Sequence, residues 1–389
     1  MPLKIPSTQQ TTSMPPTART FSPIWQQLDW TYIAKSINSK TPDDIEHALN
    51  TPAVNLDDFM ALISPAASAY LEPLARRAQR ITRQRFGNIV HFYVPLYLSN
   101  LCANHCTYCG FSIGNKIKRK LLDTQEAIEE CKAIKALGFE NLLLVTGEQS
   151  KKAGMPYFRE IIPLIRPHFS SLMLEVQPLD QHEYAELRAL GVDSVFIYQE
   201  TYHRDTYTRH HLKGKKQDFF WRLETPDRIG RAQIDKIGLG ALIGLADNWR
   251  AESLMLAQHL CYLRNTYWKS RFSISFPRLR PCEGGIAPAC QMTDSQLVQL
   301  ICAFRLLMPE VELSLSTRES AHFRDHVIPL AINHVSAYSK TQPGGYAKTN
   351  IELEQFKAHD NRKPEQVAQA VIQCGLQPVW KDWSAIFGR

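Results

Sequence analysis

The stretch from Asp123 to Thr146 reads DTQEAIEECKAIKALGFENLLLVT. Asp123 stands three residues before Glu126, which is the spacing of a capping box at the start of a helix. Apolar residues then recur at helical spacing until Gly138, where a left-handed residue can end the helix. The apolar run from Asn141 onward has the length of a buried strand. This stretch therefore predicts a helix that leads directly into a strand.

The same unit recurs along the chain from Val90 onward. Capping pairs also begin at Asp180 and Thr293, and Gly191 marks another helix end. The predicted strands are His91–Leu98, Asn141–Thr146, Leu172–Val176, Ser194–Tyr198, Ile237–Ile243, Phe272–Phe276, Val311–Leu315 and Ile332–Ser336. Eight strand-and-helix repeats predict an α/β fold, a (β/α)₈ TIM-type barrel, although an open doubly wound sheet would produce a similar pattern.

With 389 residues, the chain is long enough for a barrel with attachments. Prolines break the region before Val90 into short helices, and Trp380 and Trp383 are a large apolar group that we expect to dock on the body. The predicted final helix runs from Pro364 to Cys374. We predict a disordered tail at 1–20, a helical N-terminal extension at 21–85, the barrel at 86–345 and a C-terminal extension packed on the barrel at 346–389. A transit peptide remains an alternative for the tail.

Composition excludes several classes of protein. The hydrophobic share of 44% and charged share of 21% are those of a globular protein, and no apolar run reaches the ~20 residues of a membrane span. The net charge of +7 is scattered and forms no basic stripe with aromatic residues, so neither a nucleic acid nor a membrane is expected as a partner. Nine cysteines are too few for a disulfide scaffold. Without a signal peptide, we expect a reducing, cytoplasmic location.

Three thiols stand close together after the first predicted strand, in Cys102-Ala-Asn-His-Cys106-Thr-Tyr-Cys109. Soft thiolates suit iron–sulfur chemistry, whereas structural zinc normally has four protein ligands. His105 is a poor fourth ligand because it adjoins Cys106, and Cys282 with Cys290 matches no common zinc knuckle. The remaining cysteines, which are Cys131, Cys261, Cys302 and Cys374, are expected to be small buried apolar residues.

This CxxxCxxC spacing resembles the radical S-adenosylmethionine (SAM) superfamily. The resemblance implies that Cys102, Cys106 and Cys109 hold a 4Fe–4S cluster whose fourth iron binds SAM, with Tyr108 beside the adenine. Thr146-Gly147-Glu148 is similar to the Gly-Gly-Glu motif that receives the methionyl ammonium, with Thr in place of the first Gly. Gly238 and Gly240 look like the fifth-strand segment that passes close to adenine.

Polar residues also end the third and fourth predicted strands, where barrel enzymes bind ligands. They are Glu175 and Gln177 after the third strand, and Gln199, Glu200 and Thr201 after the fourth. We expect Glu175, Gln199 and Glu200 to contact the cofactor, together with Gly147 and Glu148.

Further motifs, from about Tyr70 to Trp383, resemble the 2-iminoacetate synthases, the tyrosine lyases of thiamine thiazole biosynthesis. They are Tyr198-Gln-Glu-Thr-Tyr202, Phe276-Pro-Arg-Leu-Arg280-Pro-Cys282, Leu315-Ser-Thr-Arg318-Glu319, the run from Ser336 to Tyr346, and Gln377-Pro-Val-Trp-Lys-Asp-Trp383. The resemblance implies scission of the Cα–Cβ bond of L-tyrosine to 2-iminoacetate and p-cresol. Related lyases of hydrogenase maturation or of tryptophan are alternatives, although Cys374 alone could not hold the second cluster of the maturation enzymes. A zinc-binding interaction module and a plain electron-transfer protein are alternatives from other classes.

The amino acid substrate that the resemblance implies is a zwitterion, so its carboxylate needs a cation. Arg318 is the candidate because guanidinium binds carboxylate with two hydrogen bonds. Tyr97 and Ser336 match substrate-lining positions of these lyases, although Tyr97 could instead be a core residue and Ser336 a turn hydroxyl. Arg318 could instead pair with Glu319 or Glu312. The resemblance also implies an electron donor such as flavodoxin or ferredoxin, and a complex with thiazole synthase, since 2-iminoacetate hydrolyses readily.

Overall fold

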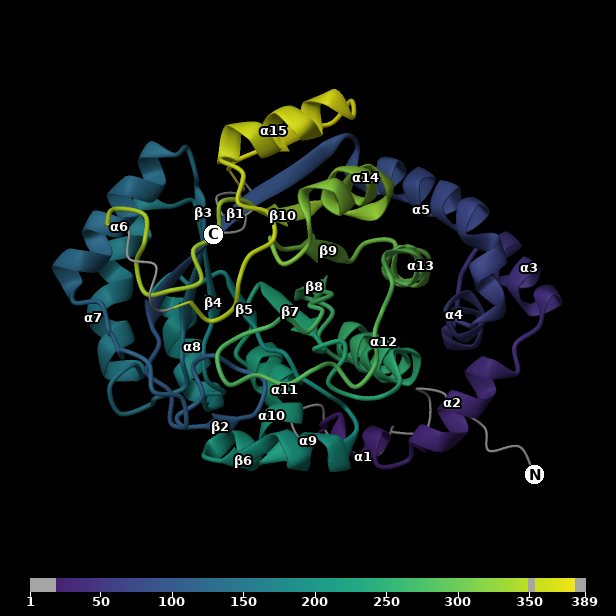
Figure 1. Cartoon of the computed structure of the whole chain (residues 1–389), viewed down its shortest axis with the longest axis horizontal. Coiled ribbons are helices and arrows are strands. Elements are labelled where there is room, and N and C mark those ends of the chain that lie inside the picture. Colours follow the sequence, from purple (N-terminus) through teal and green to yellow (C-terminus); the bar gives the residue numbers. More distant parts are fainter. Residues whose placement is uncertain (1–18, 349–353, 382–389) are drawn as a thin grey trace.

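The computed structural model describes residues 19–348 and 354–381. Its parallel strands close into a ring, because β1 pairs with β3 on one side and with β10 on the other (Figure 1). The strands are β1 (Ile89–Ser99), β3 (Asn141–Thr146), β4 (Ser171–Glu175), β5 (Ser194–Phe196), β7 (Lys236–Gly240), β8 (Arg271–Ser275), β9 (Glu312–Leu315) and β10 (His334–Ser336). Each predicted strand and the (β/α)₈ TIM-type barrel are confirmed.

Helices surround the ring of strands, and their starts follow the predicted capping chemistry. The side chain of Asp123 accepts a 2.8 Å hydrogen bond from the backbone N–H of Glu126, and capping boxes at Asp180 and Thr293 are also present. The outer helices are α6 (Thr124–Ala136), α7 (Met155–Ile165), α8 (Gln181–Ala189), α11 (Thr225–Arg231), α12 (Trp249–Thr266), α13 (Asp294–Leu307) and α14 (Ala321–Ala331). An insertion after β5 adds α9 (Arg204–His210), β6 (His211–Lys213) and α10 (Phe219–Leu223).

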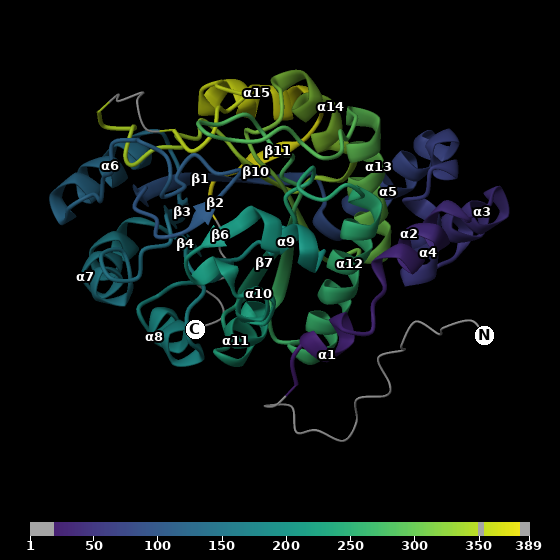
Figure 2. The same ribbon diagram turned by 60° about the horizontal axis from the view of Figure 1, so that its bottom comes forward.

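The N-terminal helices lie along one side of the barrel (Figure 2). They are α1 (Ser22–Trp25), α2 (Trp30–Asn38), α3 (Pro42–Asn50), α4 (Leu56–Leu62) and α5 (Leu71–Phe86). Helix α5 packs against α13 and α14, while α2 and α4 contact α12. Most of the predicted disordered tail, residues 1–18, lies outside the described residues.

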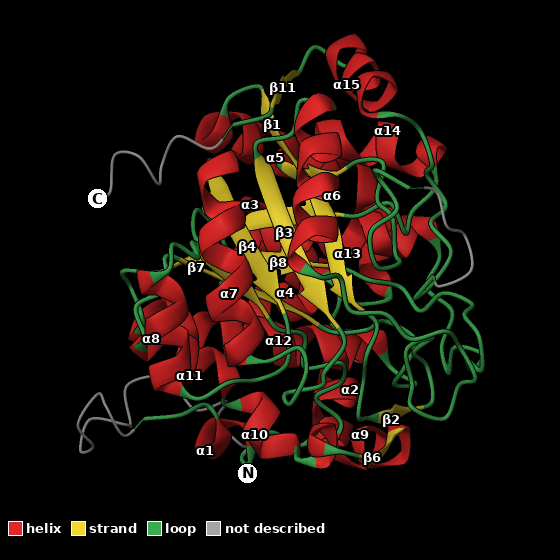
Figure 3. Cartoon of the chain, turned by 90° about the vertical axis from the view of Figure 1, so that its left-hand side faces the viewer, coloured by secondary structure: helices red, strands yellow, loops and turns green. Residues whose placement is uncertain are grey.

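The C-terminal residues return to the first strand. Helix α15 (Pro364–Gln373) ends before Gly375, and β11 (Gln377–Val379) then pairs in parallel with the start of β1 (Figure 3). The ring of Trp380 packs 4.7 Å from Phe92 and 5.2 Å from Phe139, centroid to centroid, so docking of the aromatic end is confirmed for this residue. Trp383 lies outside the described residues.

The cysteines outside the loop divide between the core and the surface. Cys131 and Cys302 are buried as predicted, and Cys261 is partly buried. The prediction for Cys374 was wrong, because this residue is exposed at the C-terminal cap of α15. Within the described ranges, no helix has the length and apolar character needed to cross a membrane.

Candidate active site

The three-cysteine loop follows β1 at the carboxyl end of the barrel strands. Cys106 lies in β2 (His105–Cys106), which pairs with β6 in a small antiparallel sheet, and only 5% of its surface is exposed. Cys102 and Cys109 are partly buried against the aromatic and aliphatic side chains inside the barrel. The fold therefore puts all three thiols on one short loop at the rim of the barrel.

The thiols share one electrostatic environment. Burial raises the pKa of all three, and the charge of Cys109 adds to this effect at Cys102 and Cys106. Lys216 acts in the opposite direction on Cys106 and Cys109. Among the described residues, no three His, Cys, Asp or Glu side chains converge on a point that would hold a single metal ion. As a donor set, three neighbouring thiols with a nearby lysine fit an anionic iron–sulfur cluster.

Gln355 joins this loop to the barrel interior, and the sequence did not indicate it. Its amide nitrogen lies 3.7 Å from Cys109 Sγ, and its amide oxygen accepts a 2.9 Å hydrogen bond from the hydroxyl of Tyr97. The backbone N–H of Gln355 donates to the carbonyl of Thr341 at 2.7 Å. The segment that carries Gln355 therefore crosses the mouth of the barrel beside the cysteine loop.

Beside the loop, two carboxylates and two cations form a buried network. Arg222 Nη1 lies 2.9 Å from Glu148 Oε1, and Arg222 Nη2 lies 3.5 Å from Glu200 Oε1. Lys216 Nζ lies 2.7 Å from the same Glu200 oxygen and 3.6 Å from Glu148. Burial opposes ionisation of both carboxyls, yet Lys216 and Arg222 hold the pKa of each below its ordinary value. Paired charges of both signs suit the zwitterionic methionyl end of SAM.

Gly147 and Gln199 directly precede the two carboxylates of this network, Glu148 and Glu200, and neither lines the cavity at the carboxyl ends of the strands. A Cβ on Gly147 would lie 2.4 Å from the carbonyl oxygen of Leu101, so only glycine lets the turn after β3 approach the cysteine loop. The buried amide nitrogen of Gln199 has no hydrogen-bond partner within the described chain. Glu148 lines a second, adjoining cavity together with Lys216 and Arg222.

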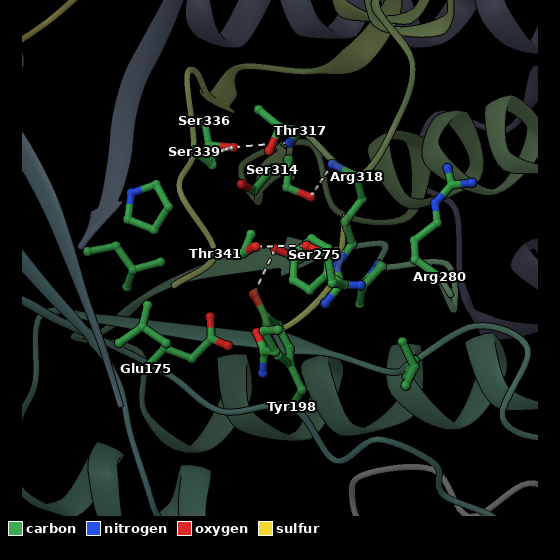
Figure 4. A pocket seen from close by; sticks show the side chains of 18 of the residues that line it. Glu175, Tyr198, Ser275, Arg280, Ser314, Thr317, Arg318, Ser336, Ser339 and Thr341 are labelled. Carbon is green, nitrogen blue, oxygen red and sulfur yellow. Dashed lines mark hydrogen bonds between the residues drawn. The ribbon is translucent and has the colours of Figure 1, made fainter. Parts of the chain in front are cut away.

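Another cavity opens at the carboxyl ends of the strands (Figure 4). Most of the predicted site residues line it, namely Tyr97, Tyr108, Cys109, Glu175, Glu200, Arg318 and Ser336. Deeper in the cavity, the hydroxyl of Tyr198 donates to Ser275 at 3.3 Å, and Ser314 donates to Tyr93 at 3.5 Å. Burial raises the pKa of Glu175 to about 7, against the opposing effect of Arg318.

Arg318 follows β9 and faces this cavity (Figure 4). Its guanidinium carbon lies 3.5 Å from the centroid of the Phe356 ring. Glu319 does not neutralise it, because that carboxylate is held by Arg278 and Arg280 instead. Glu312 pairs with Lys236 at the opposite end of the barrel. Within the described chain, Arg318 therefore has no acidic partner and keeps its N–H groups for a ligand.

The hydroxyl groups of Ser336 and Tyr108, unlike the guanidinium of Arg318, are held by hydrogen bonds within the protein. The hydroxyl of Ser336 accepts a 3.2 Å hydrogen bond from the backbone N–H of Thr317, and another of 3.2 Å from Ser339. Tyr108 shares a 2.7 Å hydrogen bond with His211 on β6, which fixes its ring beside Cys109. Lys216, Arg222, Gln355 and Phe356 were missed, since no sequence motif marks the segments that carry them.

Comparison with known proteins agrees with this geometry. Residues 96–257 match the Radical SAM superfamily, and residues 275–377 match the Biotin and Thiamin Synthesis associated domain. The chain is 68% identical to 2-iminoacetate synthase of Escherichia coli (strain K12) and 67% identical to that of Salmonella typhimurium, over 95% of this chain and 98% of each relative. The FeFe-hydrogenase maturase HydG from Carboxydothermus hydrogenoformans superposes with a TM-score of 0.86 at 27% identity, covering 96% of this chain and 87% of that one.

Proposed function

Since the chain belongs to the 2-iminoacetate synthase family of radical SAM enzymes, we propose that its barrel cavity cleaves the Cα–Cβ bond of L-tyrosine to 2-iminoacetate and p-cresol. The enzyme uses a 4Fe–4S cluster and SAM, as its superfamily does. When bound, these groups supply a 5′-deoxyadenosyl radical that removes a hydrogen atom from the substrate amine. The protein must bind, orient and shield the reactants.

Cys102, Cys106 and Cys109 would hold the cluster, and the buried charge network would hold the methionyl end of SAM. Glu148 and Glu200 offer carboxylates to the ammonium, while Lys216 and Arg222 offer cations to the carboxylate. Tyr108 lies at the wall of the cavity, where the adenine would stack. Gly147 lets the turn after β3 approach the cysteine loop, and Gln199 offers a buried amide nitrogen without a partner in the described chain. The carboxyl of Glu175 faces the cavity, where it can accept hydrogen bonds from ribose hydroxyls.

Arg318 carries the assignment of an amino acid substrate. It is a cavity-facing guanidinium with no acidic partner among the described residues, so it can bind the tyrosine carboxylate through two N–H groups. Tyr97 and Ser336 line the same cavity and would contact the remainder of the substrate. Gln355 and Phe356 cover this region and would help to exclude water and oxygen.

The direct test is anaerobic reconstitution of the cluster, followed by incubation with SAM, a reductant and L-tyrosine. The proposal predicts p-cresol and 5′-deoxyadenosine in a tyrosine-dependent reaction. Phenylalanine is the matched control substrate, because it lacks only the phenol hydroxyl. Cofactor cleavage without any p-cresol would reject tyrosine Cα–Cβ scission while leaving radical SAM chemistry intact.

An electron donor must reach the cluster, and the surface over β2 and β6 is our candidate docking surface. Cys106 lies in β2, directly beneath it. Leu212 and Ile113 are exposed apolar side chains there, at 49% and 45%, and Arg209 and Lys213 are exposed cations without an acidic partner in the described chain. An apolar centre with a basic rim fits an acidic one-electron carrier such as a flavodoxin.

We also propose that 2-iminoacetate passes directly to thiazole synthase, because the product hydrolyses in water. The test holds the two enzymes on opposite sides of a dialysis membrane. Undiminished thiazole formation across the membrane would argue against a complex of the two.

A further inference from the structure

Glu200 has an unusual backbone conformation for a residue of the candidate cofactor site. Its φ angle is 69°, in the left-handed region that a non-glycine residue enters only at an energetic cost. Its carboxylate meets Lys216 at 2.7 Å and Arg222 at 3.5 Å. Such a conformation persists only where the surroundings hold it in place.

The two residues after Glu200 are held by one buried carboxylate. The hydroxyl of Thr201 donates to Glu252 Oε2 at 2.6 Å, and the backbone N–H of Tyr202 donates to Glu252 Oε1 at 2.5 Å. Glu252 lies on α12 and is 2% exposed, and Thr201 is fully buried. Both oxygens of this carboxylate are therefore committed to the turn that carries Glu200.

The hydroxyl and the carbonyl of Tyr202 form hydrogen bonds as well. Its hydroxyl shares a 2.9 Å hydrogen bond with Nδ1 of His259, which lies two turns after Glu252 on the same face of α12. Its carbonyl accepts a 3.0 Å hydrogen bond from the indole N–H of Trp25 on α1. Phe21 stacks on the His259 ring at 4.1 Å, so the N-terminal segment and α12 brace the turn together.

We propose that Glu252 is a positioning residue for SAM: by holding Thr201 and Tyr202 it keeps Glu200 left-handed, with its carboxylate directed at Lys216 and Arg222. Glu252 lines neither described cavity, so it acts only through the turn. This inference rests on the proposed role of Glu200 in binding SAM and adds a function for α12 and α1.

The test compares Glu252→Gln with the reconstituted wild-type enzyme. A glutamine keeps the shape but offers only one acceptor oxygen: with that oxygen on the Tyr202 N–H, its NH₂ group faces the Thr201 hydroxyl, which can then no longer donate to it. We expect the SAM dissociation constant, measured by calorimetry, to rise about tenfold. Iron content and tyrosine affinity are expected to stay at wild-type values.

Glu130→Gln is the matched control. Glu130 is also a buried glutamate, 5% exposed, that accepts two backbone N–H groups, from Tyr346 at 2.7 Å and Ala347 at 3.1 Å. It does not contact the turn at Glu200. We expect this variant to lower the Tm without changing SAM affinity.

A second pair of variants keeps the test decisive if Glu252→Gln does not fold. Thr201→Val removes the hydroxyl with little change of shape and should weaken SAM binding, while Thr201→Ser restores the hydroxyl and should recover it. A SAM dissociation constant within twofold of wild type in folded Glu252→Gln or Thr201→Val would overturn the proposal. Because the readout is SAM binding, a failure to produce p-cresol would reject the proposed lyase activity without touching this result.

Discussion

The guanidinium carbon of Arg318 lies 3.5 Å from the ring centroid of Phe356, a contact that joins the loop after β9 to the segment crossing the barrel mouth. Stacking on an aromatic face orients a guanidinium and leaves the N–H groups at its edge available. The contact therefore presents Arg318 to the cavity in one orientation.

Replacement of Arg318 should weaken tyrosine binding selectively. We expect Arg318→Ala to cost about 2 kcal/mol, or roughly a 30-fold higher tyrosine Kd, which is the scale of a lost charge-assisted contact. Arg318→Lys should recover only part of this loss, since lysine cannot bind a carboxylate in the same bidentate way. Arg280→Lys is the control, because Glu319 already holds Arg280. An unchanged tyrosine Kd in Arg318→Ala would remove this residue from the substrate site.

The cysteine loop gives a prediction whose control is a second cysteine in contact with the loop. Cys106→Ser should abolish cluster incorporation, measured as iron content and visible absorbance after anaerobic reconstitution. Cys282→Ser should retain the cluster, because the thiol of Cys282 only donates a 3.2 Å hydrogen bond to the carbonyl of Tyr108. Loss of iron in Cys282→Ser would identify a fourth protein ligand and contradict an open iron site.

The raised pKa of Glu175 predicts a pH dependence of cofactor binding. Its carboxyl titrates at about 7 in the folded protein, so it is largely protonated at pH 6 and ionised at pH 8. Only the ionised form accepts hydrogen bonds with both oxygens, and SAM affinity should therefore increase from pH 6 to pH 8 and then level off. Glu175→Gln should flatten this profile.

Glu175 also makes the stability of the folded protein depend on pH. Its contribution to stability falls as the pH rises, whereas its contribution to SAM affinity grows. Because folding raises this pKa, the contribution of Glu175 to stability is present at low pH and is lost as the pH rises through about 7. In the absence of SAM, the Tm of Glu175→Gln minus that of the wild type should therefore be more positive at pH 8 than at pH 5.5. Identical pH profiles of wild type and variant in both assays would show that Glu175 does not titrate in this range.

Charge reversal over β2 and β6 tests the donor docking surface. Arg209→Glu with Lys213→Glu should slow cluster reduction by an acidic flavodoxin at least about fivefold at low ionic strength, and added salt should shrink the difference. Reduction by dithionite should be unchanged. The matched control reverses two exposed lysines elsewhere, Lys132→Glu with Lys269→Glu. Equal slowing in both double variants would point to net charge instead of a docking surface.

The buried pair of Arg324 and Asp360 should anchor the segment that covers the cavity. Both side chains have no exposed surface, and Arg324 Nη1 lies 2.5 Å from Asp360 Oδ2. Arg324→Met leaves a buried carboxylate with fewer partners, which typically costs about 3–5 kcal/mol. We expect a clearly lower Tm than in Arg362→Met, whose side chain is 21% exposed. Equal Tm values in the two variants would show that the buried Arg324 holds Asp360 no more strongly than Arg362 does.

The barrel could be predicted because its signals are local. Each strand is a short apolar run, and caps such as Asp123 with Glu126 lie within one turn of chain. The cysteine loop was readable for the same reason. Lys216, Arg222 and Gln355 were not, because their roles depend on which distant segments the fold brings together.

The structure gives a reason for Gly238 that differs from the predicted one. The glycines of this strand predicted a close approach of backbone to adenine. In the structure, a Cβ on Gly238 would lie 2.0 Å from the ring of Phe196 on the neighbouring strand. Packing inside the barrel therefore already requires glycine at this position.

Gln355 and Phe356 are translated after every strand of the barrel, yet they form part of its reaction chamber. Because synthesis runs from the N-terminus to the C-terminus, the cavity stays uncovered until the polypeptide is nearly finished. The three thiols remain accessible to solvent until then. A chain cut just before Gln355 would lose the cover over its metal-binding loop, and with it Asp360, the buried partner of Arg324.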